Sequence, residues 1–336
     1  MANLFPILNQ ERQITGIARL AAYGVPVGDG HLVEYKTLPV KSIMNRVVSG
    51  RRLPFTLSIN PYRGCEFACR YCYARYTHEF MELRKPEDFE RQIFVKQNTS
   101  WLLEQELRKH DPAETIAIGT ATDPYQPIER TAGMTRAILE VFAKRSGLRL
   151  GLITKSTLIE RDISLLQQIA GNNSLTIHLT ITTTDTLLAR VLEPRAPRPD
   201  LRFRTVSRLR NAGLRTGIAC APVLPAITDS PLALEAMVRS AADAHASSFF
   251  VQALFLKGCS KTVFDAFIAK EFPQLVAAYK ARYADGAFVT ATYRSALEKR
   301  MRDLCVKYRI RQGIEERKSR TPAISAPVQG DLFAAS

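Results

Sequence analysis

The sequence predicts an α/β fold, an incomplete TIM-type (β/α)6 barrel followed by a C-terminal helical extension. From about Thr56 onward, short β-rich runs alternate with amphipathic segments or Pro/Asp-rich loops, and the runs are apolar almost throughout. Such alternation is typical of parallel βαβ units, and apolar strands are expected where both faces of a sheet are covered. The six runs are TLSIN, TIAIG, LRLGLIT, SLTIHLTITT, LRTGIACAPVL and SSFFVQALFL. An open doubly wound sheet is the alternative.

Helix signals follow the strands. After the third run, Thr157 and Glu160 form a capping-box pattern. One face of the helix that follows is apolar and consists of Ile159, Ile163, Leu166 and Ala170. The last helix also has one apolar face, made of Leu297, Met301, Leu304, Cys305 and Tyr308. We expect this helix to dock on the core with its basic side outward.

The chain of 336 residues is long enough to bury one large core, because 46% of its residues are hydrophobic. We expect an N-terminal extension over 1–50, the barrel over 51–258, the helical extension over 259–313 and a flexible tail over 314–336. The tail is polar and contains Pro and Ser, so it cannot bury enough surface to order itself.

Charge and targeting signals suggest where the protein works. The net charge of +15 favours polyanions such as nucleic acid, although a solvated basic surface would give the same charge. Residues 1–10 lack a basic leader before an apolar core, and no apolar run could span a bilayer. We expect a soluble cytoplasmic protein that does not enter a membrane.

Three of the six cysteines, Cys65, Cys69 and Cys72, crowd into eight residues directly after the first strand. A loop there lies at the barrel mouth, where its thiolates can converge on a metal. Thiolates are the natural ligands of iron-sulfur clusters. The alternative is a zinc site completed by His78, although zinc usually takes paired cysteine elements on separate knuckles.

The segment CEFACRYC matches the CxxxCxxC signature of the radical SAM superfamily, and the longer stretch NPYRGCEFACRYCYAR resembles its spore photoproduct lyase-like, or DNA repair photolyase-like, branch. The resemblance runs from about Val40 to Lys257. It implies a barrel of the radical SAM kind that binds a 4Fe-4S cluster and S-adenosyl-L-methionine and generates a 5′-deoxyadenosyl radical. It further implies lyase or repair-like chemistry on nucleic acid, with DNA favoured, and an electron donor such as flavodoxin or ferredoxin.

The resemblance also implies residue roles. Tyr71, just before the third cysteine, is expected to pack on the adenine. Polar residues after the second to fourth strands would hold the methionyl and ribose ends, namely Thr122, Lys155 and Thr184, with Asp123 and Ser156 as second choices. A lysine ammonium can pair with the methionyl carboxylate, and a threonine hydroxyl can donate and accept. Alternatively, Lys155 is an ordinary surface residue, and Thr122 and Thr184 are present only because threonine favours strands.

The resemblance breaks at Ala121, where lyases that repair the thymine dimer carry a hydrogen-donating cysteine. Tyr125 and Cys259 are the candidate catalytic residues in its place, because phenol and thiol hydrogens are the most weakly held. As alternatives, Tyr125 packs at the rim and Cys259 is a buried small hydrophobe. We expect Cys220 and Cys305 to be core residues.

Two further features suggest partners. The stretch 190–215 carries arginines that could lie along a phosphate backbone, including Arg195, Arg198, Arg202 and Arg204. The alternatives are that Arg208 and Arg210 are helix surface charges and that Glu193 and Arg195, which belong to a block shared with the family, shape the barrel mouth. The segment Gln329–Phe333 resembles the peptide by which repair proteins dock in the sliding clamp, although short motifs recur by chance.

Two other functions stay open. One is a radical SAM enzyme that modifies RNA, protein or a small molecule. The other is a zinc-stabilised nucleic-acid-binding module without catalysis.

Overall fold

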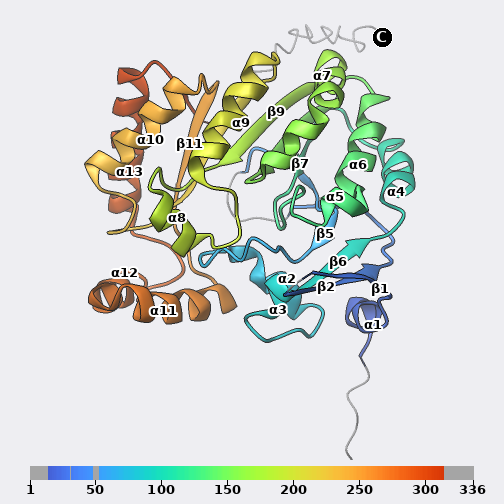
Figure 1. The fold of residues 1–336 in the computed structure, drawn as a ribbon, viewed down its shortest axis with the longest axis horizontal. Helices are drawn as coiled ribbons and strands as arrows, with labels where there is room; N and C mark the ends of the chain where they lie inside the picture. The colour runs from blue at the N-terminus through green and yellow to red at the C-terminus, as the bar shows by residue number, and fades with distance from the viewer. Residues whose placement is uncertain (1–13, 31, 48–52, 314–336) are drawn as a thin grey trace, which may run out of the picture.

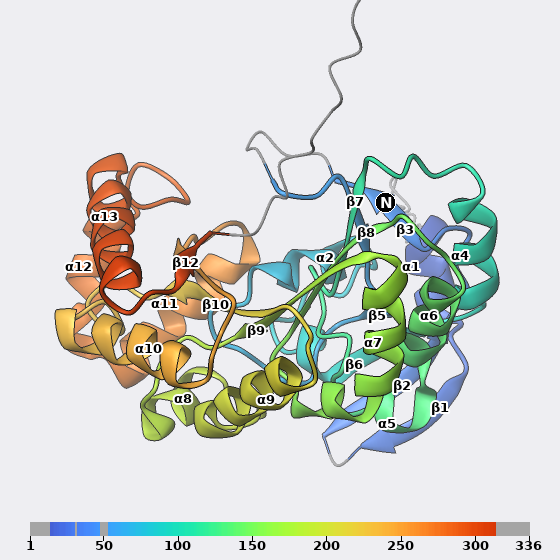
Figure 2. The same cartoon turned by 90° about the horizontal axis from the view of Figure 1, so that it is seen from above.

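The computed structural model describes residues 14–30, 32–47 and 53–313. Its centre is an eight-stranded sheet in the order β12-β11-β10-β9-β8-β7-β4-β3 (Figures 1 and 2). The strands are β3 (Met44–Arg46), β4 (Leu57–Ile59), β7 (Thr115–Ile118), β8 (Arg149–Thr154), β9 (Ser174–Thr180), β10 (Thr216–Val223), β11 (Ser248–Ala253) and β12 (Arg311–Gln312).

Six strands from β4 to β11 are parallel and neighbour one another in chain order. They are the six runs expected from the sequence, so the incomplete (β/α)6 barrel is confirmed. The doubly wound alternative fails, since such a sheet reverses its strand order part-way along the chain. Within the described residues, β3 and β12 lie at the two ends of the sheet without pairing to each other.

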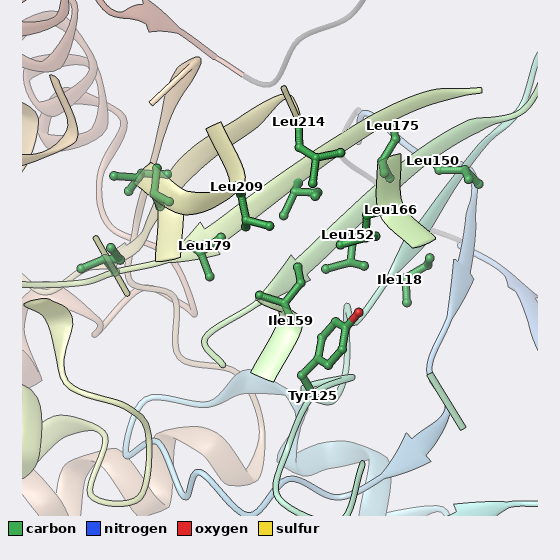
Figure 3. Packing of buried hydrophobic residues seen from close by; sticks show 14 of the residues in the cluster. Ile118, Tyr125, Leu150, Leu152, Ile159, Leu166, Leu175, Leu179, Leu209 and Leu214 are labelled. Carbon is green, nitrogen blue, oxygen red and sulfur yellow. The ribbon is translucent and has the colours of Figure 1, made fainter. Parts of the chain in front are cut away.

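Helices α4 (Thr99–Leu107), α6 (Met134–Ala143), α7 (Ile163–Asn172), α9 (Pro199–Asn211) and α10 (Pro231–Asp243) cover one face of the sheet (Figure 1). Their apolar sides meet the strands in one core. Figure 3 shows Leu150, Leu152 and Leu179 of the strands interleaved with Leu166 and Leu209 of the helices. Cys220 and Cys305 belong to the same core, as expected.

The helix after β8 begins differently from the expectation. Ser156, rather than Thr157, is the N-cap, and its hydroxyl accepts a hydrogen bond from the backbone N–H of Leu158 at 3.2 Å. The residues that follow form a 3-10 helix, η2 (Thr157–Asp162), before α7 starts. The capping-box prediction is therefore wrong, because Glu160 accepts a hydrogen bond from the Thr205 hydroxyl of α9 instead of closing the cap.

A second sheet, in the order β1-β2-β6-β5, was not foreseen. It consists of β1 (Pro26–Gly30), β2 (Val33–Leu38), β6 (Gln92–Lys96) and β5 (Tyr62–Arg63), with α1 (Gly16–Ala22) beside it. Because β2 pairs in parallel with β6, the N-terminal segment is joined to a strand that follows the cysteines in the chain. β5 leads directly into those cysteines, so this sheet supports their loop.

After the barrel come α11 (Cys259–Glu271), η3 (Pro273–Leu275), α12 (Val276–Arg282), α13 (Ala291–Lys307) and finally β12, which pairs in parallel with β11. In α13 the apolar face is buried as expected, including Leu297, Met301 and Cys305. The segment Gln329–Phe333 lies outside the described residues. Among the described helices, none has the length and apolar character needed to cross a membrane.

Candidate active site

The turn between β5 and the cysteine loop requires a glycine. Gly64 has φ +84°, and a Cβ there would lie 2.8 Å from the carbonyl oxygen of Phe89 and 2.9 Å from that of Gln92. Only glycine fits both the left-handed backbone and this close approach. The next residue, Cys65, donates its N–H to the Phe89 carbonyl at 3.0 Å, which joins the loop to the segment before β6.

Gln126 ties the same loop to the segment after β7. The fully buried Gln126 amide donates to the Gly64 carbonyl at 3.3 Å and to the Thr122 hydroxyl at 3.0 Å. Its oxygen accepts from the N–H of Glu66 at 3.0 Å, and Thr122 itself donates to the Gly64 carbonyl. Thr122 thus uses its hydroxyl to hold the loop. Sequence reasoning missed Gln126, although it lies only four residues after Thr122.

The three thiols lie on this loop and affect one another electrostatically. Burial raises the pKa of each thiol, and neighbouring cysteines of the triplet raise the pKa of Cys65 and Cys69 further. The ammonium of Lys155 acts in the opposite sense on Cys69 and Cys72. In the described part of the chain, no three His, Cys, Asp or Glu side chains stand close enough together to hold a metal ion.

Beside Cys69 lies a polar group formed by the buried Tyr71, Glu193, Thr182 and Arg202 and the half-buried Lys155. The Tyr71 hydroxyl donates to Glu193, and the Lys155 ammonium lies 5.6 Å from the centroid of the Tyr71 ring. Glu193 also accepts from the Thr182 hydroxyl at 3.2 Å and pairs with Arg202 at 2.5 Å. Burial opposes the Glu193 charge, but Arg202 and Lys155 outweigh it and lower the pKa of that carboxyl. The carboxylate therefore stays ionised and can orient Tyr71.

Arg202 corrects an expectation from the sequence. Its side chain is 1% exposed, and besides Glu193 it donates to the carbonyls of Pro197 at 2.7 Å and Thr180 at 3.0 Å. It cannot lie along a phosphate backbone, so that prediction is wrong for Arg202. The signal was present in the sequence, because Arg202 shares helical spacing with the buried Val206 and Leu209 of α9.

The other named arginines of the stretch are placed differently. Arg198 and Arg204 are exposed, and both pair with Asp200. Arg195 is half-buried and donates to the carbonyl of Glu90 at 3.3 Å.

The two second-choice residues connect the ends of β7 and β8. The buried carboxylate of Asp123 accepts from the Thr154 hydroxyl at 2.7 Å and from the backbone N–H of Lys155 at 2.7 Å. Ser156, as the N-cap of η2, starts the turn that follows. These contacts set the direction in which Lys155 leaves β8. Thr184 is half-buried after β9.

A family model described as the radical SAM superfamily matches residues 59–234, which include the end of β4, the cysteine loop and the strands from β5 to β10. The chain belongs to the radical SAM superfamily. Rv2578c, an uncharacterized protein of Mycobacterium tuberculosis, is 34% identical over 334 residues, spanning 94% of this chain and 98% of that protein. Spore photoproduct lyase of Clostridium acetobutylicum is 28% identical over 163 residues, spanning 48% of this chain and 44% of that one.

Solved structures agree on the fold. A spore photoproduct lyase mutant with bound AdoMet and dinucleoside spore photoproduct matches with a TM-score of 0.63 at 15% identity. The match covers 88% of this chain and 85% of that one. At this identity the likeness shows the fold alone. It confirms the expected spore photoproduct lyase-like architecture.

Radical SAM membership implies S-adenosyl-L-methionine and a 4Fe-4S cluster, and the residues present suit that cluster. Three thiols on one supported loop provide three iron ligands. Burial raises the pKa of Cys65 and Cys72 overall, and hydrogen bonds from the backbone N–H groups of Phe67 and Ala74 offset part of that rise. The three thiols, with the Lys155 ammonium nearby, are therefore a suitable set of ligands for an iron–sulfur cluster.

The two candidate catalytic residues lie apart from the polar group beside Cys69. Tyr125 is 1% exposed, sits in the core near Ile118 and Ile159 (Figure 3), and donates to Asp162 at 3.2 Å. Cys259, half-buried at the start of α11, lines a cleft with Glu79. Burial and Glu79 raise the pKa of its thiol to about 11.

The zinc alternative expected His78 as a fourth ligand. The structure packs this ring edge-on against Phe89 and Phe94 and joins its Nε2 to the carbonyl of Gln92 at 2.9 Å. Burial lowers the pKa of the ring to about 4, so it is neutral and Nε2 donates. His78 thus supports the start of β6 rather than the thiols.

Proposed function

We propose that this radical SAM enzyme carries out lyase or repair-like chemistry on nucleic acid, with DNA the favoured substrate. The observation that carries the proposal is the polar group of Tyr71, Lys155 and Glu193 beside Cys69. The net charge of +15 and the lyase-like fold support nucleic acid as the substrate. When bound, the cluster would supply one electron to the sulfonium of S-adenosyl-L-methionine, whose C5′–S bond would break to give methionine and the 5′-deoxyadenosyl radical.

The residues around the loop would bind and orient the cofactor. Cys65, Cys69 and Cys72 would each ligate one iron and leave the fourth for the methionyl amino and carboxylate groups. The Lys155 ammonium, held at the end of β8, would pair with that carboxylate. Tyr71, fixed through its hydroxyl by Glu193, would present its ring to the adenine.

Thr122, Asp123, Ser156 and Thr184 would complete the site from the ends of β7, β8 and β9. The first three contribute mainly by holding the loop and the strand ends, since their polar atoms already bond within the chain. Thr184 is half-buried after β9 and is the candidate for direct contact with the ribose or methionyl end.

The return of a hydrogen to the product must differ from the thymine-dimer lyases, because Ala121 replaces their donor cysteine. Of the two candidates, Cys259 has the more accessible side chain, while Tyr125 is enclosed in the core. Deuterium incorporation from solvent should fall in Cys259→Ser but not in Tyr125→Phe. The opposite pattern would assign the role to Tyr125.

Anaerobic reconstitution with iron and sulfide, followed by reduction with dithionite, tests the cofactor chemistry. The wild-type chain should bind iron and release 5′-deoxyadenosine from S-adenosyl-L-methionine, and the matched Cys220→Ala variant should do the same. A colourless zinc protein that releases no 5′-deoxyadenosine would refute the proposal that the chain is an enzyme. It would favour the alternative, a zinc-stabilised nucleic-acid-binding module.

Substrate class is tested by stimulation of 5′-deoxyadenosine release. Damaged DNA should stimulate it more than RNA, peptides or metabolite mixtures. Stimulation by one of those instead would favour the alternative, radical SAM modification of RNA, protein or a small molecule. Flavodoxin or ferredoxin should replace dithionite as the electron donor.

Co-elution tests the sliding clamp as a partner. The full chain should co-elute with a clamp, and a chain lacking Gln329–Phe333 should not. Unchanged co-elution of the shortened chain would show that this segment does not bind the clamp.

A further inference from the structure

A buried arginine follows directly after the cysteine loop. Arg75 ends the 3-10 helix η1 (Tyr73–Arg75), whose N-cap is Cys72. The residue is 3% exposed, and the carboxylate that pairs with it, Glu90, is 8% exposed. Arginine is almost never buried unless it is paired. The segment that carries the expected iron ligands therefore also carries a buried ion pair.

Hydrogen bonds fix the guanidinium of Arg75 against the cysteine loop. Nη1 donates to the carbonyl of Pro86 at 2.7 Å and to the carboxylate of Glu90. Nη2 donates to the carbonyl of Cys69 at 3.2 Å. The guanidinium carbon also lies 5.7 Å from the centroid of the Phe89 ring. Arg75 thus joins the cysteine loop to the segment before β6.

The two charges of this pair act unequally on the nearest cysteine of the loop. Burial raises the pKa of the Cys72 thiol, and of the charges around it Arg75 opposes that rise most strongly. Glu90 acts on the same thiol in the opposite sense and more weakly. The combined effect of the ion pair at Cys72 is therefore that of a positive charge.

One donor of Arg75 is left over. Its Nε is buried and has no hydrogen-bond partner among the residues that the structure describes. A buried donor without a partner is rare, because it has lost its water without gaining another acceptor. The sulfur atoms of an iron-sulfur cluster accept such hydrogen bonds. The orphaned donor therefore suits a chain that holds a cluster beside Arg75.

We propose that Arg75 tunes the reduction potential of the 4Fe-4S cluster, as a positioning residue that holds the Cys69 carbonyl and keeps a permanent positive charge beside the iron ligands. This inference rests on the proposed cluster and adds the residue that sets how readily it accepts an electron. On reduction the external donor loses one electron and the cluster gains one negative charge. A nearby cation stabilises that charge, and arginine stays protonated at any working pH. Arg75 thus brings the cluster within reach of a weaker electron donor.

A redox titration of the reconstituted full chain, followed by electron paramagnetic resonance, tests the proposal. Arg75→Gln should lower the ratio of reduced to oxidised cluster at a fixed potential by about 10-fold or more, which corresponds to a fall of about 59 mV for one electron. Glu90→Gln breaks the same ion pair but leaves the cation, so it should raise that ratio. Arg75→Lys keeps the charge and should stay close to wild type.

The matched control is Arg84→Gln, which removes an exposed cation two residues before Pro86. Solvent and salt screen an exposed charge, so the ratio should not change. Iron and sulfide content and the urea midpoint show that each compared variant is loaded and folded.

The signs of the two shifts decide the outcome. If Arg75→Gln and Glu90→Gln shift the ratio in the same direction, or neither differs from Arg84→Gln, the pair only holds the loop and the inference is overturned. Should Arg75→Gln bind no iron, a raised ratio in Glu90→Gln supports the inference and an unchanged one overturns it. A wild-type chain that forms no 4Fe-4S cluster would overturn the cluster assignment itself. A normal wild-type cluster with unshifted variants overturns only the role of Arg75.

Discussion

Replacing Arg202 with methionine should destabilise the fold strongly, even though the sequence places Arg202 in a basic stretch. The guanidinium is buried, pairs with Glu193 at 2.5 Å and donates to the carbonyls of Thr180 and Pro197. Methionine fills much of the volume but leaves a buried carboxylate without its cation. Breaking one side of a buried ion pair costs about 3–5 kcal/mol, a large part of the 5–15 kcal/mol by which domains are usually stable.

Guanidinium chloride denaturation of the cluster-free chain, followed by circular dichroism, measures this cost. Arg198→Met is the matched control, because Arg198 is exposed at the N-cap of the same helix and its surface pair with Asp200 contributes at most about 1 kcal/mol. Adding Glu193→Gln to Arg202→Met should recover part of the loss, since no uncompensated charge remains. A cost below about 1 kcal/mol for Arg202→Met, or equal costs for Arg202→Met and Arg198→Met, would refute the buried pair.

Three further changes should have defined effects. Cys69→Ala should abolish iron binding and 5′-deoxyadenosine release while the cluster-free chain still folds; full iron content would contradict the ligand assignment. Burial lowers the pKa of His78 and His178 to about 4, so the unfolded chain binds more protons below about pH 6.5. The free energy of unfolding should therefore fall between about pH 6.5 and 4, by roughly 3 kcal/mol per histidine, and His178→Leu should flatten the slope measured by urea titration. Gly119→Ala should cost more than about 2 kcal/mol, because φ is +86° and the new Cβ would lie 2.4 Å from the carbonyl oxygen of Ile153. Gly171→Ala, in open space on α7, should be neutral or stabilising, and equal midpoints for the two would contradict the argument.

The barrel and the cysteine loop could be predicted from the sequence because both depend on local patterns of residues. Six apolar runs separated by helical segments leave few arrangements other than sequential parallel strands, and the structure has those strands in that order. Cys65, Cys69 and Cys72 are close in the chain, so one loop presents them together whatever the rest of the molecule does.

Tertiary structure alone decided which charged groups are buried and which distant segments meet. Arg202 looks like its neighbours Arg198 and Arg204 in composition, yet only Arg202 faces Glu193. That pairing depends on how α9 packs against the end of β9.

The second sheet could not be read from the sequence either, since β2 and β6 pair across more than fifty residues and each is unremarkable alone. The contact between the rings of Tyr73 in the cysteine loop and Phe255 after β11 arises in the same way. Short-range patterns thus determined the fold class and the expected cluster ligands. Long-range packing determined what surrounds the ligands, because burial and contact depend on residues far apart in the chain.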